Sequence, residues 1–265
     1  MNKERLTVTA APVEVFLGDV AANLAAATDA MRLASAYTPD IVVFPELLNT
    51  GFIKNAAQMH AMAEPADGPT VTTMRRLAAM HDCAVAGSYN ALAGDGTYSN
   101  RGFIILPDGS ASFYDKRHLF CLSKESEVFT PGTEPTLIVP FRGWNVALDV
   151  CYDLRFPEWM RNIGYAYDIM LLPANWSVAR AYALEHLLIA RAIENQAPIV
   201  CANLAGSDAY GSYDGCTFAF DCMGNPAFKP GTLTAEFSLD EIKKARSRMP
   251  CAFDADPFEI SIRRS

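Results

Sequence analysis

Strand-like and helix-like segments alternate along the whole chain of 265 residues, and no linker rich in Ser, Gly or Pro separates them. Strands that alternate with helices are typical of sheets covered by helices, whereas strand-turn-strand patterns indicate hairpins. Both patterns occur in this chain. The sequence therefore predicts an α/β protein in which helices pack on a large mixed sheet or a pair of sheets, with residues 1–265 forming one domain.

Apolar spacing and turn residues place the individual elements. Asp19 is positioned to cap a first helix that ends before Pro39, and Gly68-Pro69 opens a second helix. Three further helices are predicted over 156–164, 181–195 and 239–245. Strands are predicted over 6–13, 40–45, 83–92, 103–106, 112–114, 136–140, 146–150, 169–173, 199–204, 217–221 and 234–238.

Composition and charge argue against several classes of protein. Hydrophobic residues make up 51% of the chain and charged residues 20%, as in folded rather than disordered proteins. A net charge of −8 without a cluster of Lys or Arg argues against a nucleic-acid partner. No apolar run approaches the roughly 18 residues of a membrane span, and the N-terminal residues lack the apolar core of a signal peptide. We therefore expect a soluble cytoplasmic protein without membrane contact.

The seven cysteines lie between Cys83 and Cys251, with no CxxC pair and no His cluster at metal-ligand spacing. This pattern argues against a disulfide framework and against a structural metal. Reduced thiols are the expectation.

Cys151 is the first candidate for chemistry, because it ends the predicted strand over 146–150. A strand end holds a thiol rigidly, and nearby backbone N–H groups and cations can activate it and bind an oxyanion. The alternative is a buried cysteine that only fills space. The four histidines offer a poor choice of base, since only His118 lies in a polar, loop-like run.

Two further candidates lie where predicted strands end. Glu46 follows the apolar run over 41–45, and Lys116 ends the second strand of a hairpin. Taken singly, each is compatible with a solvated surface residue. The chain has no GxSxG and no HExxH motif, which argues against serine hydrolases and zinc proteases. Gly94-Asp-Gly96 lacks the strand and helix that flank a phosphate-binding loop, which argues against dinucleotide binding.

Taken together, the three segments Phe-Pro-Glu46, Tyr-Asp-Lys116-Arg-His-Leu-Phe and Val-Cys151-Tyr-Asp-Leu-Arg-Phe-Pro-Glu resemble the nitrilase, or carbon–nitrogen hydrolase, superfamily. The resemblance covers essentially the whole chain and continues through Pro-Ala-Asn-Trp176 and the helix Ala-Arg-Ala-Ile-Glu-Asn-Gln196. It implies a four-layer α-β-β-α sandwich and assembly as a homodimer or larger homo-oligomer.

The resemblance also implies roles for the three residues. Cys151 would be the nucleophile, Glu46 the general base and Lys116 the cation that stabilises the tetrahedral intermediate. A second glutamate that positions the lysine precedes a Pro-Gly pair, so Glu125 is the better match and Glu127 the alternative. The implied reaction converts an amide to an acid and ammonia through a thioester on Cys151. It needs no metal ion and no organic cofactor.

Within the superfamily, the residues after Cys151 are similar to the amidase branches, and above all to the ω-amidases, which act on 2-oxoglutaramate and 2-oxosuccinamate. Such a substrate carries a carboxylate at its far end, for which Arg155 and Arg180 are candidates. Tyr152 and Trp176 are candidates to line the pocket or to belong to the core. Asp149 departs from the family pattern, and we expect it to point away from Cys151 and to serve packing or an interface.

Three alternatives remain at this point. A deaminated glutathione has a similar amide in a larger molecule, and another aliphatic amide or an N-carbamoyl compound would suit the same chemistry. A catalytically silent scaffold of the same fold is the alternative that is not an enzyme.

Overall fold

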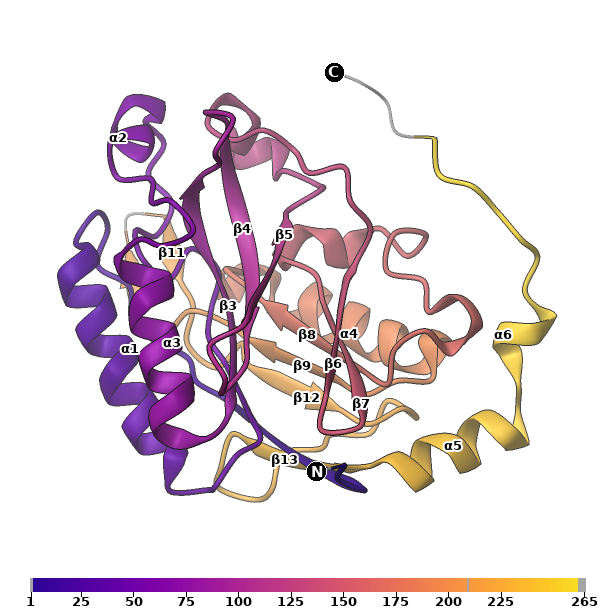
Figure 1. The fold of residues 1–265 in the computed structure, drawn as a ribbon. Helices are drawn as coiled ribbons and strands as arrows, with labels where there is room; N and C mark the ends of the chain where they lie inside the picture. The colour runs from indigo at the N-terminus through magenta and orange to yellow at the C-terminus, as the bar shows by residue number, and fades with distance from the viewer. Residues whose placement is uncertain (1, 209, 262–265) are drawn as a thin grey trace.

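Two β-sheets packed face to face form the centre of the molecule (Figure 1). The structure is a computed structural model that describes residues 2–208 and 210–261. The first sheet has the strand order β13-β1-β2-β3-β4-β5, and the second has the order β12-β9-β8-β7-β6. A short hairpin of β10 and β11 lies outside both sheets.

The strands of the first sheet are β1 (Arg5–Ala10), β2 (Ile41–Val43), β3 (Ala84–Leu92), β4 (Tyr98–Ile105), β5 (Ala111–Asp115) and β13 (Thr234–Ser238). Those of the second are β6 (Leu137–Phe141), β7 (Trp144–Leu148), β8 (Ile169–Pro173), β9 (Ile199–Ala202) and β12 (Phe218–Phe220). The separate hairpin consists of β10 (Ser207–Asp208) and β11 (Gly211–Ser212).

The helices are α1 (Val20–Ser35), α2 (Ala56–Ala61), α3 (Pro69–His81), α4 (Ala181–Asn195), α5 (Leu239–Arg248) and α6 (Cys251–Asp254). Five short 3₁₀ helices are η1 (Cys121–Ser123), η2 (Glu125–Glu127), η3 (Cys151–Arg155), η4 (Ile163–Tyr165) and η5 (Val178–Arg180). No helix in the described ranges is long and apolar enough to cross a membrane.

Alternating side chains on the strands build the four layers. In β2, Ile41 and Val43 belong to the apolar core shared with the second sheet, whereas Val42 packs with residues of α1 and α3 on the outer face. On the far side, Leu184 and Leu188 of α4 complete the core over the second sheet. The predicted α-β-β-α sandwich is therefore confirmed.

The predicted elements are found with small shifts at their ends, apart from one. The helix predicted over 156–164 is wrong, because this segment forms turns and ends in η4. Its groups bond elsewhere: the indole of Trp159 donates to Tyr114 Oη at 2.9 Å, and Thr136 Oγ1 donates to the Trp159 carbonyl at 3.3 Å. Tertiary hydrogen bonds thus replace the helical ones.

Candidate active site

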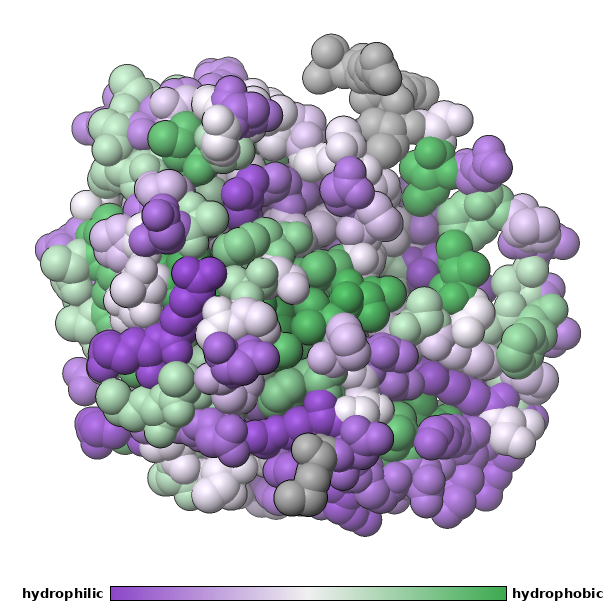
Figure 2. Space-filling model, in the orientation of Figure 1, coloured by the Kyte–Doolittle hydropathy of each residue, from purple (hydrophilic) through white to green (hydrophobic). Residues whose placement is uncertain are grey.

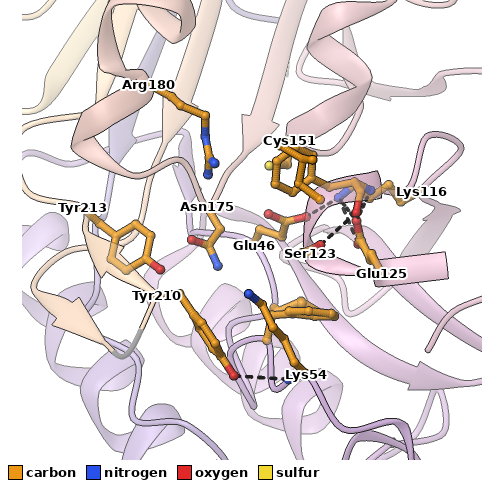
Figure 3. A pocket seen from close by; sticks show the side chains of 14 residues that line it. Glu46, Lys54, Lys116, Ser123, Glu125, Cys151, Asn175, Arg180, Tyr210 and Tyr213 are labelled. Atoms are coloured by element: carbon orange, nitrogen blue, oxygen red, sulfur yellow. Dashed lines mark hydrogen bonds and ion pairs between the residues drawn. The ribbon is translucent and has the colours of Figure 1, made fainter. Parts of the chain in front are cut away.

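Four polar side chains from distant parts of the chain meet in one pocket (Figure 3). Glu46 follows β2, Lys116 directly follows β5, Glu125 begins η2 and Cys151 begins η3 after β7. All four are at least 94% buried, since their exposed fractions are 4%, 2%, 3% and 6%. They line a cavity of about 170 Å³.

Lys116 lies at the centre of this group. Its Nζ donates to Glu46 Oε1 at 2.7 Å and to Glu125 Oε2 at 2.8 Å. Burial alone would lower the pKa of Lys116, but the charges of Glu125 and Glu46 outweigh burial and raise that pKa well above its usual value. The ammonium therefore stays charged at any physiological pH.

The backbone fixes this lysine from both sides. The N–H of Lys116 donates to the Asn100 carbonyl at 3.0 Å, and its carbonyl accepts from the N–H of Gly132 at 3.0 Å. Gly132 packs so closely that a Cβ there would lie 1.9 Å from the carbonyl oxygen of Asp115. The Pro-Gly pair after Glu125 thus has a steric reason, because only glycine allows this approach.

Cys151 occupies a tight turn, with a φ of 50° in the left-handed region that costs a non-glycine residue about 1–3 kcal/mol. Burial raises the pKa of the Cys151 thiol well above its ordinary value, and the charge of Glu46 raises it further against the opposing effect of Lys116. The backbone N–H of Asn175 faces the sulfur. The thiol is therefore neutral at rest and needs a base.

Glu46 is the carboxyl group next to this thiol. Burial raises its pKa, Lys116 opposes this effect, and the nearby charge of Glu125 adds to it. Burial therefore destabilises both the thiolate of Cys151 and the carboxylate of Glu46.

Asn100 of β4 is a residue that sequence reasoning missed. It is fully buried, and its Nδ2 donates to Glu46 Oε1 at 2.7 Å and to Glu125 Oε1 at 3.0 Å. Its Oδ1 accepts from Ser88 Oγ at 2.9 Å, which orients the amide. The sequence shows only a short polar run there, Ser99-Asn100-Arg101, which Gly102 separates from the apolar residues that begin at Phe103, and such a run does not single out Asn100.

Glu125 is the glutamate that pairs with Lys116 in addition to Glu46. Besides Lys116 and Asn100, it accepts from the backbone N–H of Phe120 at 2.6 Å. The alternative, Glu127, has a side chain that is 63% exposed and pairs with Lys124 at 3.1 Å. Glu125, rather than Glu127, therefore contacts the lysine.

The other end of the pocket carries two cations that reach toward it from opposite sides in Figure 3, Arg180 and Lys54. Arg180 lies over the ring of Phe120 at 4.9 Å, and the Lys54 ammonium lies over the ring of Tyr210 at 4.7 Å. Among residues 2–208 and 210–261, no ion pair joins either of them to a carboxylate.

No pattern in the sequence marks Lys54, because it resembles any exposed lysine until the chain folds. The remaining wall of the pocket includes Tyr213 and Asn175.

The other predicted substrate-binding residues lie around a smaller adjoining cavity. Tyr152, Arg155 and Trp176 line this space of about 20 Å³, which Cys151 and Arg180 also border. The Arg155 guanidinium lies 4.8 Å from the centre of the Trp176 ring, and Trp176 is 3% exposed. These residues lie next to Cys151 without lining the main pocket.

Asp149 is fully buried, and it accepts from Thr136 Oγ1 at 2.9 Å. The expectation of a packing role fits this position, whereas a role of this side chain in an interface is wrong, because it has no exposed surface. Burial and the neighbouring charge of Asp153 raise the pKa of Asp149 well above its ordinary value.

Within the part of the chain that the structure describes, no three His, Cys, Asp or Glu side chains are grouped as a metal would require. The Lys116 centre instead combines one cation and two carboxylates beside a thiol.

Comparisons with known proteins identify the family to which this chain is similar. The sequence matches the profile of the family described as Carbon-nitrogen hydrolase over residues 7–247. It is 39% identical over 234 residues to Omega-amidase YafV of Yersinia enterocolitica, covering 86% of this chain and 89% of that protein. The 2-oxoglutaramate amidase of Bacillus subtilis strain 168 is 28% identical over 217 residues, or 80% of this chain and 83% of that protein.

Among solved structures, a CN-hydrolase superfamily protein from Xanthomonas campestris, described with an arsenic adduct in its active site, has a TM-score of 0.89. It is 31% identical, and the match covers 98% of this chain and 100% of that one.

Proposed function

We propose a mechanism and a substrate for this chain from the premise that it belongs to the carbon–nitrogen hydrolase family. It is a cysteine-dependent hydrolase that acts on carbon–nitrogen bonds of linear amides, as its omega-amidase relatives indicate. The residues that act and the amide that is cleaved are the subject of the proposal.

The mechanism uses Cys151 as nucleophile and Glu46 as base. Glu46 takes the thiol proton, and the thiolate attacks the amide carbon to give a tetrahedral oxyanion. The permanent charge of Lys116 and the backbone N–H of Tyr152 stabilise this oxyanion, a contribution of about 2.7–4 kcal/mol for one donor in comparable sites. The observation that carries the proposal is the buried Lys116 ammonium, 2.7 Å from Glu46 and 2.8 Å from Glu125, in the pocket that Cys151 lines.

Collapse of the intermediate breaks the carbon–nitrogen bond. The nitrogen takes the proton held by Glu46 and leaves as ammonia, while the acyl group stays on Cys151 as a thioester. Glu46, again a carboxylate, then removes a proton from water, whose oxygen attacks the thioester and releases the acid and the thiol. Glu125 and Asn100 hold Lys116 and Glu46 in place throughout.

The substrate that we propose is the ω-amide of a small 2-oxo dicarboxylic acid, such as 2-oxoglutaramate or 2-oxosuccinamate. Its support is the charge of the pocket: the two carboxylates already face Lys116, whereas Arg180 and Lys54 have no carboxylate partner in the described residues. A substrate with a carboxylate at the end remote from its amide would supply one.

Size favours the same choice. The cavity of about 170 Å³ is smaller than the roughly 300–1,000 Å³ of pockets that enclose drug-sized ligands. A five-carbon amide suits it better than deaminated glutathione, which stays the alternative substrate.

Ammonia release is the direct test, with 2-oxoglutaramate, 2-oxosuccinamate, deaminated glutathione, an N-carbamoyl amino acid and a simple nitrile as substrates. We expect the first two to be preferred and Cys151→Ala to abolish turnover. Cys83→Ala is the matched control, because Cys83 is a buried core cysteine whose pKa is raised to about 12 by burial. Intact mass should show an acyl adduct on wild type. A wild type that ignores every ω-amide, or an active Cys151→Ala, contradicts the proposal.

The cations have their own test. Arg180→Met and Lys54→Met should raise the KM for 2-oxoglutaramate but leave hydrolysis of uncharged butyramide unchanged. Lys124→Met is the control, since Lys124 is an exposed lysine outside the pocket lining. Equal losses on both substrates would mean that the cations serve the fold rather than the substrate.

We further propose a homodimer or larger homo-oligomer in the cytoplasm. Apolar side chains gather near the middle of the face in Figure 2, over β5 and β6, and Ile163 is 65% exposed. All seven cysteines are unpaired, which suits a reducing compartment. Light scattering of the wild type and of Ile163→Lys tests the assembly, and a monomeric wild type contradicts it.

A further inference from the structure

A second set of buried polar groups joins the segment that carries Lys116 to the segment that carries Cys151. Its centre is the carboxylate of Asp153, which has no exposed surface. Oδ1 accepts from the backbone N–H of His118 at 2.9 Å and lies 2.8 Å from Nδ1 of the same residue. Oδ2 accepts from the Tyr114 hydroxyl at 2.9 Å and from the backbone N–H of Val150 at 3.2 Å. We call these four residues the Asp153 network.

The partners of Asp153 lie close to Lys116 and Cys151 in the sequence. Tyr114 and His118 stand two residues before and two residues after Lys116, and Val150 directly precedes Cys151. One carboxylate thus ties the residues that flank the cation to the residue next to the nucleophile. Residues 116 and 151 follow strands of different sheets, β5 and β7, and their relative position depends on contacts of this kind.

The surroundings of the network fix its protonation pattern. Its carboxylate accepts from two backbone N–H groups and the Tyr114 hydroxyl, so Nδ1 of His118 carries the proton that completes the set. Burial and then the charge of Asp153 raise the pKa of the neighbouring acid Asp149. On the same side, the Arg117 guanidinium lies 5.8 Å from the centre of the Trp159 ring.

Aromatic packing orients the imidazole. The ring of His118 stacks on Phe156 with centroids 3.6 Å apart and planes 10° apart, and it meets the edge of Trp159 at 5.5 Å. The Trp159 indole donates to the Tyr114 hydroxyl, so that hydroxyl is directed toward Asp153. The histidine is thus held in one orientation with its Nδ1 on the carboxylate.

We propose that His118 and Asp153 are positioning residues, which set the distance between the Lys116 ammonium and the Cys151 sulfur and thereby the rate of attack. They touch neither substrate nor reacting atoms. A misplacement of about 1 Å in a catalytic group can cost roughly a hundredfold in rate. The pair therefore governs kcat rather than substrate binding.

The test compares two substitutions at His118, whose side chain is 21% exposed and so tolerates replacement better than Asp153 does. His118→Phe keeps the aromatic stack but removes the N–H donor. His118→Asn removes the stack but keeps an N–H that can reach the carboxylate. We expect His118→Phe to lower kcat about ten- to a hundredfold with KM near the wild-type value, and His118→Asn to recover most of the loss.

The matched control is His186→Phe. His186 also stacks on an aromatic ring, that of Tyr182 at 3.9 Å. Its Nδ1 lies 2.8 Å from the backbone carbonyl oxygen of Tyr182 rather than from a carboxylate, and His186 lies on α4 away from the pocket lining. We expect wild-type kinetics from this variant.

The kinetic test of this inference rests on the proposed function. Alkylation of Cys151 needs no substrate and therefore tests the inference separately. Iodoacetamide labelling of the Cys151 peptide, followed by mass spectrometry, should slow in His118→Phe and recover in His118→Asn. The inference is overturned if both substitutions lose kcat equally, if only KM changes, or if labelling is unaffected. A wild type that labels normally but hydrolyses no amide would count against the proposed function alone.

Discussion

Replacing Asn100 tests how hydrogen bonds in the pocket set the pKa of Glu46. The Nδ2 hydrogen bonds of Asn100 stabilise the ionised forms of Glu46 and Glu125, at 2.7 and 3.0 Å. Asn100→Ala removes both bonds from a position without solvent access. Water has little room to replace them, so the carboxylates lose part of their stabilisation.

The size of the effect follows from these two bonds. A hydrogen bond to a charged group contributes about 1.5–3 kcal/mol, and one pKa unit corresponds to about 1.36 kcal/mol. Loss of the bond to Glu46 should therefore raise the pKa of this carboxyl by a further 1–2 units, roughly. Because Glu46 must be ionised to accept the thiol proton, activity is lost as pH falls through its pKa. The acidic limb of the activity profile should move upward by the same 1–2 units, roughly.

The assay is ammonia release from 2-oxoglutaramate between pH 4.5 and 9, analysed as kcat/KM, with thermal melting at each pH. Ser88→Ala is a milder version, since Ser88 only orients the amide, and it should give a smaller shift in the same direction. Asn23→Ala is the control, because Asn23 is an equally buried asparagine that bonds the backbone at Phe16 and Asn49. It should lower stability without moving the profile. An unshifted acidic limb in Asn100→Ala would refute the reasoning.

Three further predictions concern stability. Lys116→Met leaves two buried carboxylates without their cation, so it should lower the free energy of unfolding in urea by about 3–5 kcal/mol at pH 7. The loss should be smaller at pH 5, where the buried carboxylates accept protons more readily. An equal loss at both pH values would contradict this. Asp149→Asn mimics the neutral acid. Since the folded pKa is raised, ionisation costs stability as pH rises, so the variant should melt higher than wild type at pH 9 and similarly at pH 5, and an identical difference at both would count against it. In Gly132→Ala, the new Cβ would lie 1.9 Å from the carbonyl oxygen of Asp115, so this residue, which precedes Lys116, should be displaced. Both kcat and the melting temperature should fall. A variant with wild-type values would disprove the steric argument.

The segments that carry the chemistry could be predicted because their signals are local. A short apolar run places β2, and turn residues place the hairpin strands β5 and β7. The residues that follow these strands, Glu46, Lys116 and Cys151, fall at strand ends. The spacing of Glu125 before Pro131-Gly132 is equally local. Their resemblance to a known family supplied the expected roles and the four-layer fold, which periodicity alone leaves open between one sheet and two.

Other features had no local signal. The pattern over 156–164 predicts a helix, yet the side chains and backbone of this segment bond to Tyr114 and Thr136, which the sequence cannot place beside it. Asn100, Lys54 and Asp153 are ordinary polar residues until the fold surrounds them.

The sequence by itself determined which residues lie at strand ends and which side chains face the core, because both depend on a few neighbouring positions. Only the tertiary structure decided which charges meet. Lys116 is paired with two glutamates while Lys54 and Arg180 are without a carboxylate in the described residues, although all three are cations in the sequence. The physical reason is that burial and charge pairing are properties of contacts between distant segments, and those contacts set the pKa values on which the chemistry of Cys151 depends.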